Sequence, residues 1–479
     1  MIERAASATP PPSGRKPGLN IAPRQVRGLE QKLRAYHRQF AGRFRRKEQR
    51  QWSLKYMQGQ MLDLPHKSIE PMAQAVDDGN IQAVQQFISA GAWSDTEVIQ
   101  AHQARVAQTL GRANGVLIVD GCDFPKQGDD SVGVARQYCG PLGKIANCQA
   151  SVVLGYASEA GATLLDRRLF LPQEWFDQAH RNRWVKCRIP PETPFRSKPT
   201  LGAEMVDALL TAGTVPFQWV TMDEGFGRAP HLLDRIHAQN KYFFAEVPRA
   251  TRAWCRRPAV VPPGPPPGTG RPPTVSYLAP DAPAAQRVEH LAQALPHKHW
   301  QRYIVHEGTK GPLAIEIAAR RVVMVEDGLP GRTEWLVIRR PLGKSAPDSW
   351  KYYRSNAPKR TALKTLARLT AWRWPIETVI EECKDELGFD QYEVRGWLGW
   401  HHHTTMTMLS HHFLVELRVE MADDAPALTV SQARKLLQVV LPKREFDAAA
   451  VITEIERIQQ ANYAAYRSHR KRHLQALKA

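Results

Sequence analysis

The sequence predicts a multidomain α/β protein of the α+β kind, with a central sheet domain interrupted by a β-rich insertion and flanked by helical regions. Three observations indicate this. Amphipathic helical patterns fill the chain up to about residue 111. Short apolar runs separated by glycine follow from residue 115, first alone and then alternating with helical patterns. A proline- and glycine-rich stretch then leads into a second set of strand-like runs.

The composition indicates an intracellular protein with a polyanionic partner. The 479 residues include 66 Lys and Arg against 47 Asp and Glu, a net charge of +19, which makes nucleic acid the leading partner and a solvated basic surface the alternative. The six cysteines form no C-x-x-C pair, so we expect reduced thiols in a cytoplasmic protein. No signal peptide or membrane span is expected, because no apolar run approaches about 18 residues.

The N-terminal part is expected to consist of a tail and a helical domain. Residues 1–25 are rich in Pro, Ser, Gly and Arg, which is typical of a disordered basic tail. Residues 26–111 carry dense positive charge with aromatic residues such as Phe44 and Trp52 between the basic ones. This favours a helical DNA-binding domain, although a solvated basic face over an aromatic core has the same pattern.

Residues 112–248 are expected to form the first part of a sheet domain. Three strands come first and helices then alternate with strands, in the order VLIVDGC, CQASVVLGYAS, TLLDRRLFL, helix LGAEMVDALLTAG, strand FQWVTMD, helix HLLDRIHAQ, strand KYFFAEVP. A three-stranded meander followed by alternating helices and strands is the order of a ribonuclease-H-like domain.

The second half of the chain is expected to interrupt and then complete this domain. Residues 249–358 predict a β-rich insertion, which begins near the proline–glycine segment 256–275, where neither helix nor central strand can form. Helical patterning returns over 359–420, the second part of the ribonuclease-H-like domain. Residues 421–479 predict a C-terminal helical region with a very basic end.

Two of the predicted strands end on a carboxylate. VLIVDGC delivers Asp120 and FQWVTMD delivers Asp223, 103 positions later. In a ribonuclease-H-like order these strands lie side by side, so the two carboxylates would repel each other unless a cation lay between them. Magnesium prefers carboxylate oxygen and retains water for substrate phosphates, and it therefore fits this pair.

A third carboxylate is expected from the helix predicted at RWPIETVIEECK, which offers Glu377, Glu381 and Glu382. Pro375 suits the first turn of a helix, which places Glu377 near the catalytic edge of the sheet. Glu381 and Lys384 follow on the same face. Such a face suits metal ligation and phosphate contact, and an ordinary surface ion pair would give the same pattern.

These blocks resemble the DDE-type transposases of bacterial insertion sequences. VLIVDGCDFPKQG, VTMDEGFG and RWPIETVIEECKDELGFDQYEVRGWLGWHHH look like the three motif blocks of that family, and the likeness covers roughly residues 34–414. The resemblance implies a catalytic, metal-binding triad of Asp120, Asp223 and Glu377. It also implies two Mg²⁺ (or Mn²⁺) ions per active site, on a ribonuclease-H-like fold with a β-rich insertion.

The third block resembles the branch with a Tyr-Arg-Glu-Lys signature. Its Arg, Glu and Lys match Arg373, Glu377 and Lys384, and its tyrosine would fall at Thr370. This departure puts one phosphate contact in question, which Trp372 or Trp374 could supply instead.

Further residues are expected to contact DNA. The segment after the first strand offers basic, polar and aromatic side chains, for which a purely structural hairpin is the alternative; they are Lys126, Arg136, Gln137, Tyr138 and Lys144. Tyr392 and Arg395 belong to the third block, where phosphate contact and a packed helix end are equally good interpretations. Three consecutive histidines, 401–403, point in different directions along a helix, so packing is favoured over a metal site.

The function predicted from these features is DNA transposition. The protein would bind the ends of its mobile element in double-stranded DNA, cleave phosphodiester bonds, and join the 3′-hydroxyl ends to target DNA. Paired ends imply a homodimer in the DNA complex. The alternatives are a nuclease that uses the same carboxylates without strand transfer, and a domesticated DNA-binding accessory protein.

Overall fold

The computed structural model describes residues 18–264, 274–308, 311–343, 347–445 and 447–476. Most of the predicted N-terminal tail and residues 265–273 of the proline–glycine segment therefore lie outside the described residues. The first described helix begins at Pro23.

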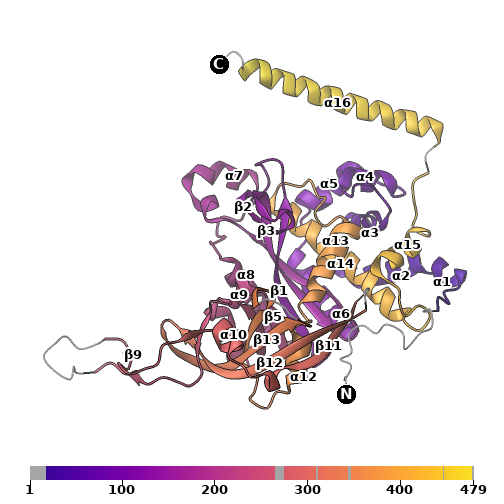
Figure 1. Ribbon diagram of the computed structural model, residues 1–479. Helices are drawn as coiled ribbons and strands as arrows, with labels where there is room; N and C mark the ends of the chain where they lie inside the picture. The colour runs from indigo at the N-terminus through magenta and orange to yellow at the C-terminus, as the bar shows by residue number, and fades with distance from the viewer. Residues whose placement is uncertain (1–17, 265–273, 309–310, 344–346, 446, 477–479) are drawn as a thin grey trace.

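Twelve strands of the described chain join one mixed sheet (Figure 1), and two more form a small separate ladder. The strands are β1 Val116–Pro125, β2 Ala135–Cys139, β3 Lys144–Ser158, β4 Gly161–Phe170, β5 Trp219–Met222, β6 Tyr242–Val247, β7 Arg252–Trp254, β8 Val260–Val261, β9 Tyr277–Leu278, β10 Gln286–Arg287, β11 Gln301–Gly308, β12 Gly311–Glu326, β13 Leu329–Pro341 and β14 Lys351–Ser355. The separate ladder pairs β8 with β9.

Helices precede, interrupt and follow these strands. They are α1 Pro23–Arg27, α2 Leu29–Arg38, α3 Lys47–Met61, α4 Ile69–Ala75, α5 Ile81–Ala90, α6 Asp95–Thr109, α7 Arg181–Lys186, α8 Lys198–Ala212, α9 Glu224–Gly227, α10 Pro230–Ala238, α11 Val288–Gln293, α12 Leu363–Leu369, α13 Trp374–Leu387, α14 Trp397–Glu420, α15 Val430–Gln438 and α16 Ala448–Ala476. The prediction of an α+β protein with a large sheet and many helices is confirmed.

The strands around β1 combine both kinds of pairing. β1 is antiparallel to β3, and β3 is antiparallel to β4. On its other side β1 is parallel to β5, and β5 is parallel to β6. The apolar residues Val116–Val119 are buried, as expected for a strand covered on both faces. The strands β1, β5 and β6 therefore run in the same direction, and β1 continues past the end of β5 as far as Pro125.

The strands of the predicted insertion extend this same sheet. β14 pairs antiparallel with β6, and the order continues through β13, β12, β7 and β10. Figure 1 shows the long strands β12 and β13 lying below β1 and β5. Short β2, at the tip of a hairpin with β3, is a strand that the sequence pattern did not predict. Its five residues alternate in exposure, a signal too short to separate from a loop.

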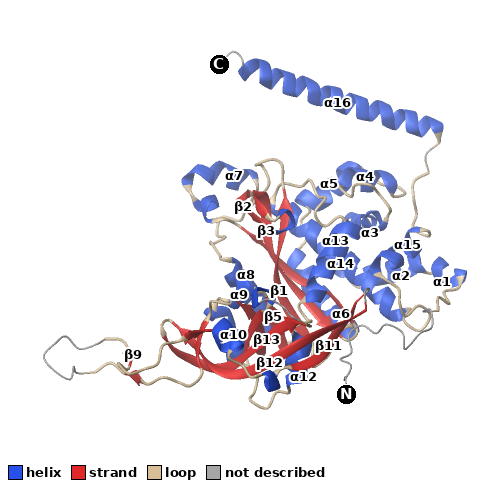
Figure 2. Ribbon diagram, in the orientation of Figure 1, coloured by secondary structure: helices blue, strands red, loops and turns tan. Residues whose placement is uncertain are grey.

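Helix α14 is the centre of the helical part. Nineteen of its 24 residues are buried, because helices from both ends of the chain surround it. It packs on α3, α5 and α6 of the N-terminal part, on α13 and α15, and on β4. Figure 2 shows these helices grouped together on one side of the sheet. The N-terminal helices and the C-terminal part thus share one core.

A glycine lets α9 approach the sheet closely. A Cβ at Gly227 would lie 2.1 Å from the backbone oxygen of Glu246 in β6, so no larger residue fits without a backbone shift. Because α9 follows Asp223 directly, this close approach also fixes where β5 ends.

Two further features concern the cysteines and the helices of the described residues. All six cysteines are free, and five of them are buried. None of the helices in the described part of the chain is long and apolar enough to cross a lipid bilayer.

Candidate active site

The register between β1 and β5 brings Asp120 level with Asp223. The parallel pairing runs from Val116 opposite Trp219 to Val119 opposite Met222, so the next residue of each strand is an aspartate. Equivalent positions of neighbouring parallel strands point to the same face of the sheet. The juxtaposition predicted for these two carboxylates is therefore built into the strand pairing.

Asp120 is buried, whereas Asp223 begins a short helix. The Oδ1 atom of Asp120 accepts a hydrogen bond from the N–H of Gly121 at 2.8 Å. Asp223 is the N-cap of α9, and its Oδ1 accepts from the N–H of Phe226 at 3.1 Å. Capping is a common structural role for aspartate, and here it also holds the side chain at the end of β5.

Helix α13 contributes the third carboxylate. Pro375 lies in its first turn and Glu377 follows in the same turn. Arg373, just before the helix, donates from Nη1 to Oδ2 of Asp120 at 3.1 Å and from Nη2 to Oε1 of Glu377 at 2.5 Å. One guanidinium therefore bridges a carboxylate of the sheet and a carboxylate of the helix.

The charges at this edge perturb each other. Burial raises the pKa of Asp120 to about 7; Asp223 and Glu377 push it in the same direction, and Arg373 opposes them. Burial disfavours the charged form of Arg373, but Asp120 and Glu377 offset this, so the pKa of Arg373 lies above its usual value. The carboxylate cluster thus requires a positive charge, and the guanidinium supplies it.

A cavity of about 600 Å³ opens on Asp120 and Glu377, but Asp223 is not among the residues that line it. Asp120, Arg373 and Glu377 line it together with Glu381 and Lys384, one and two turns further along α13. Glu382 does not face this cavity, because its Oε2 lies 2.9 Å from Nε2 of the buried His411. Of the three glutamates considered as the third carboxylate, Glu377 and Glu381 therefore face the cavity, and Glu382 contacts a buried histidine instead.

One acidic residue at this edge was not singled out from the sequence. Glu246 follows Ala245, the partner of Met222, so it lies level with Asp223 on the next parallel strand. It is buried, forms an ion pair with Lys351 at 2.5 Å, and adds to the negative potential around Arg373. The signal was available, because KYFFAEVP is a third apolar run that reaches a carboxylate.

The residues predicted to contact DNA separate into exposed and buried groups. Arg136, Tyr138 and Lys144 are exposed on the β2–β3 hairpin, whose turn residues Gly140 and Pro141 line the cavity. Gln137 is half-buried, and its amide donates to the carbonyl of Cys148. The hairpin therefore carries polar and basic side chains at the mouth of the carboxylate cavity.

Three further predicted contacts are not among the residues that line the cavity. Tyr392 is buried, and its hydroxyl donates to Oε1 of Gln149 at 2.8 Å. Lys126 lies 3.6 Å from the centroid of the Tyr392 ring, and burial lowers the lysine pKa to about 8. Arg395 is exposed and pairs with Asp130. The position of Tyr392 therefore matches a packing role, whereas Arg395 is exposed to solvent.

The position of the missing signature tyrosine is occupied by a buried threonine. The hydroxyl of Thr370 donates to the carbonyl of Ala367 at 2.7 Å. Trp372 and Trp374 do not line the carboxylate cavity; they line a second cavity of about 290 Å³ on another face of α13, together with Pro375 and Thr378. Neither tryptophan is therefore positioned to contact a phosphate in the cavity that holds Asp120.

The three consecutive histidines pack in the core, as the sequence predicts. His402 lies 2.9 Å from the carbonyl of Ile88 and stacks on Trp93, and His403 lies 2.8 Å from the hydroxyl of Tyr56. Among the residues that the structure describes, no group of three or more His, Cys, Asp or Glu is arranged to hold a metal ion. At the carboxylate cluster, Arg373 donates hydrogen bonds to both Asp120 and Glu377.

Carboxylates on adjacent central strands, beside a cavity with basic residues, are typical of nucleases that act on phosphodiesters through divalent cations. The chain belongs to this class: a family described as DDE superfamily endonuclease matches residues 39–312, more than half of the sequence, and the chain is a member of that family. Nucleases of this superfamily use divalent metal ions. The match includes Asp120 and Asp223 and ends before Glu377.

A named relative agrees with the predicted resemblance. The chain is 26% identical over 179 residues to a protein of Microchaete diplosiphon named "Probable transposase for insertion sequence element IS701". The aligned part is 37% of this chain and 43% of that relative, so the chain spans less than half the length of the protein it matches. The prediction of a DDE-type protein similar to insertion-sequence transposases is confirmed.

The choice of third carboxylate can be tested on α13 itself. Glu377→Gln is expected to remove DNA cleavage, because it deletes the charge that faces Asp120 across the cavity. Glu381→Gln, which faces the same cavity, is expected to retain cleavage within about tenfold of the parent. Cleavage of a labelled linear DNA with Mg²⁺ measures both. An active Glu377→Gln beside an inactive Glu381→Gln would assign the role to Glu381.

Proposed function

We propose that the protein is a DNA transposase. It binds the ends of a mobile element in double-stranded DNA, cleaves phosphodiester bonds with two divalent ions, Mg²⁺ or Mn²⁺, and joins the resulting 3′-hydroxyl ends to target DNA. The observation that carries the proposal is the acidic cluster where the pairing of β1 with β5 stops: Asp120 and Asp223 directly follow the last paired residues, and Arg373 connects Asp120 to Glu377. Acting on bacterial DNA, the protein would work in the cytoplasm.

The catalytic domain is proposed to be ribonuclease-H-like. The order β4-β3-β1-β5-β6, with three antiparallel strands followed by two parallel ones, supports this. Its two parts would be residues 112–248 and 359–420, with 249–358 as the β-rich insertion. Residues 26–111 would form the N-terminal DNA-binding domain and residues 421–479 a C-terminal helical region, after a tail at 1–25.

The donor set fits a hard divalent cation. Asp120, Asp223 and Glu377 offer carboxylate oxygens, which Mg²⁺ prefers. The positively charged guanidinium of Arg373 already binds two of these carboxylates, Asp120 and Glu377. Bound divalent ions would supply Lewis-acid stabilisation for an in-line displacement at phosphorus, with water or a 3′-hydroxyl as the nucleophile. Cleavage and joining therefore require one site.

Other side chains of the cavity would hold the DNA backbone. Lys384 lies in the cavity, and its Nζ donates to the carbonyl of Asp123 at 3.3 Å. A phosphate oxygen is a better partner for an ammonium than a neutral carbonyl, because the hydrogen bond becomes charge-assisted on both sides. Arg136 and Lys144 on the hairpin would contact phosphates further along the duplex.

Strand joining separates the proposal from its nearest rival. Linear DNA carrying the element ends is incubated with the protein, a target plasmid and Mg²⁺, and the products are sequenced. Joined products support transposition. Cleaved ends without joining would support the DDE nuclease alternative, and binding without cleavage would support an accessory DNA-binding protein.

Removal of Arg373 is expected to strengthen metal binding in the absence of DNA. The guanidinium occupies the space between Asp120 and Glu377 and repels a divalent cation, so Arg373→Ala should bind Mn²⁺ about tenfold more tightly. Electron paramagnetic resonance of free Mn²⁺ gives the affinity without any measurement of activity. Arg395→Ala, which removes an exposed arginine paired with Asp130, is the control. Equal or weaker binding by Arg373→Ala would contradict this account.

DNA binding is expected to weaken steeply with salt, because each neutralised phosphate releases counterions. Arg136→Ala and Lys144→Ala should each lower the slope of log affinity against log salt concentration by about one. Tyr138→Ala, a neutral and exposed neighbour on the same hairpin, should leave the slope unchanged. Fluorescence anisotropy of a labelled duplex measures all three. Binding that is indifferent to salt would exclude the hairpin as a phosphate contact.

A further inference from the structure

Helix α16 extends away from the rest of the molecule (Figure 1) and exposes apolar side chains along its first half. Val451, Ile455 and Ile458 are 43%, 49% and 42% exposed, and Ile452 beside them is 58% exposed. An isolated helix gains little stability in water unless an apolar face is covered, even at a length of 29 residues. We therefore expect another surface to cover the exposed apolar residues of α16.

The spacing of these residues identifies the kind of partner. Ala448, Val451, Ile455, Ile458, Asn462 and Ala465 follow one another at alternating steps of three and four. This is the seam of a coiled coil, in which Ile455 and Asn462 take position a, and Val451 and Ile458 take position d. We name these six residues the α16 seam. A helix with such a seam packs on another helix with the same repeat.

The opposite face of α16 is polar, and one of its residues contacts α4. Thr453, Glu456 and Gln460 lie on it, and Arg457 forms an ion pair with Glu70 of α4. The connection before α16 is also fixed to α4, because the N–H of Arg444 donates to the carbonyl of Ala75. These contacts hold the helix by its polar side and leave the seam open.

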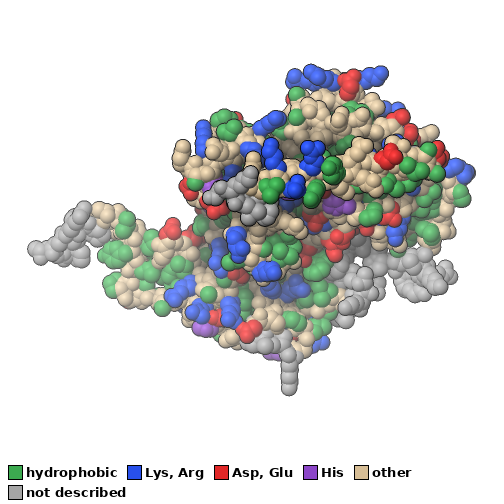
Figure 3. Space-filling view, turned by 90° about the horizontal axis from the view of Figure 1, so that it is seen from above, with side chains coloured by type: hydrophobic (Ala, Val, Ile, Leu, Met, Phe, Trp, Pro, Cys, Tyr) green, Lys and Arg blue, Asp and Glu red, His purple; other side chains and the backbone are tan. Residues whose placement is uncertain are grey.

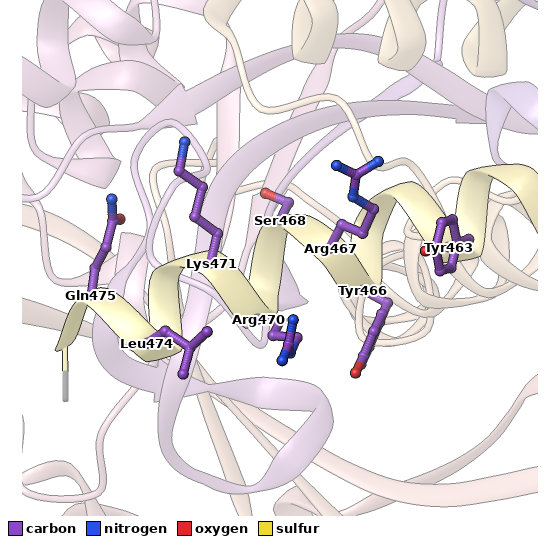
Figure 4. Close-up of a pocket in the computed structure, with 8 residues that line it drawn as sticks. All are labelled: Tyr463, Tyr466, Arg467, Ser468, Arg470, Lys471, Leu474 and Gln475. Carbon is purple, nitrogen blue, oxygen red and sulfur yellow. The ribbon is translucent and has the colours of Figure 1, made fainter.

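The second half of α16 is basic. Figure 4 shows Tyr466, Arg470 and Leu474 along one side of the helix, and Arg467, Ser468 and Lys471 along the other. All residues that line the hollow drawn there belong to α16, so it is a furrow on one helix and not an enclosed pocket. Figure 3 shows Lys and Arg side chains interspersed with apolar ones over the face from which α16 projects. Exposed cations suit a polyanion.

We infer that the α16 seam pairs in parallel with the α16 seam of a second copy of this chain. Asn462 decides between the possible arrangements, because a single asparagine at position a favours a two-stranded, in-register pair in which the two amides meet. A parallel pair brings both basic ends together. The repulsion between them is relieved when DNA lies across both, and this last step rests on the proposed function whereas the pairing does not.

The pairing is tested by the mass of the full chain in solution without DNA, measured by size-exclusion chromatography with light scattering. The expected mass is twice the chain mass of 54.0 kDa. Ile455→Glu/Ile458→Glu places two charges in the seam and should give a monomer. Thr453→Glu/Gln460→Glu adds the same charge to the polar face and should leave the dimer intact. A monomeric parent, or a dimer that survives the seam variant, overturns the inference.

The orientation of the pair is tested by cross-linking. In a Cys255→Ser background, which removes the exposed cysteine, Val451→Cys near the start of the seam should form a disulfide-linked dimer with oxidised glutathione. Gln460→Cys, outside the seam, should not. An antiparallel pair would separate the two engineered cysteines and give no cross-link, which overturns the parallel arrangement. Neither experiment depends on DNA cleavage, so a parent protein that dimerises but does not cleave DNA would leave this inference standing and count against the proposed function alone.

Discussion

Replacing Asp120 with asparagine is expected to lower both DNA cleavage and strand joining by at least about 10²–10³-fold, the scale seen when one electrostatic group of an active site is lost. Asparagine keeps the shape of the side chain and removes the charge. Asp223→Asn should have the same effect, because the two aspartates follow the last paired residues of β1 and β5 and lie level with each other. Single-turnover cleavage of an end-labelled duplex, followed by the joining reaction with a plasmid, measures both steps.

Stability separates a lost catalytic group from a damaged fold. Burial raises the pKa of Asp120 to about 7 in the folded protein. Above that pH the side chain is ionised in both states, but its charge is less favourable in the buried site than in the unfolded chain. The stability that Asp120 contributes as a neutral acid is thus lost as pH rises through about 7. At pH 8 we expect Asp120→Asn to unfold at the same or a higher temperature than the parent, with DNA affinity retained. An inactive variant that also melts earlier would point to misfolding.

The sequence was sufficient to find this edge of the sheet because the signals are local. An apolar run that stops at a carboxylate identifies β1 with Asp120 and β5 with Asp223, and Pro375 marks the start of the helix that carries Glu377. Each signal spans fewer than ten residues. The patterns needed no knowledge of distant contacts, and the strands and helix were found at the positions that they indicate.

Features that depend on distant contacts could not be predicted in the same way. Nothing in the alternation of β14 shows that it pairs with β6 more than 100 residues earlier, so the insertion could not be placed in the same sheet. The spacing of α13 puts Glu381 and Glu382 on different sides, but only packing shows that Glu382 meets His411. The burial of Tyr392 likewise depends on Gln149, far away in β3.

Helix α14 carries several buried histidines that are held in their neutral form. Burial lowers the pKa of His402 and His403 to about 4 and that of His401 to about 3, and it also lowers the pKa of His412. His403 illustrates why the neutral form suits the site. Its Nδ1 can accept from the hydroxyl of Tyr56 at 2.8 Å while its Nε2 donates to the carbonyl of Phe389 at 3.2 Å.

These histidines are expected to make the protein acid-labile between pH 6.5 and about 4. In the unfolded chain they take up protons near pH 6.5, whereas in the folded state they do so only near pH 4 or below, so the unfolded state binds more protons throughout this window. The free energy of unfolding therefore falls as pH falls. At about 1.4 kcal/mol per pKa unit, each of His402 and His403 lowers the free energy of unfolding by about 3 kcal/mol when the pH reaches 4. This is a large part of the 5–15 kcal/mol typical of a folded protein.

Urea unfolding followed by circular dichroism from pH 7.5 to pH 4.5 measures this effect. His403→Gln can still donate to the carbonyl of Phe389 and accept from Tyr56 but cannot be protonated, so it should flatten the dependence of unfolding free energy on pH. The exposed His297→Gln is the matched control and should keep the slope of the parent. Equal slopes for both variants would show that the proton uptake of acid unfolding occurs elsewhere. Because α14 packs on α13 and β4, protonation there should loosen the support of Glu377 before the whole chain unfolds.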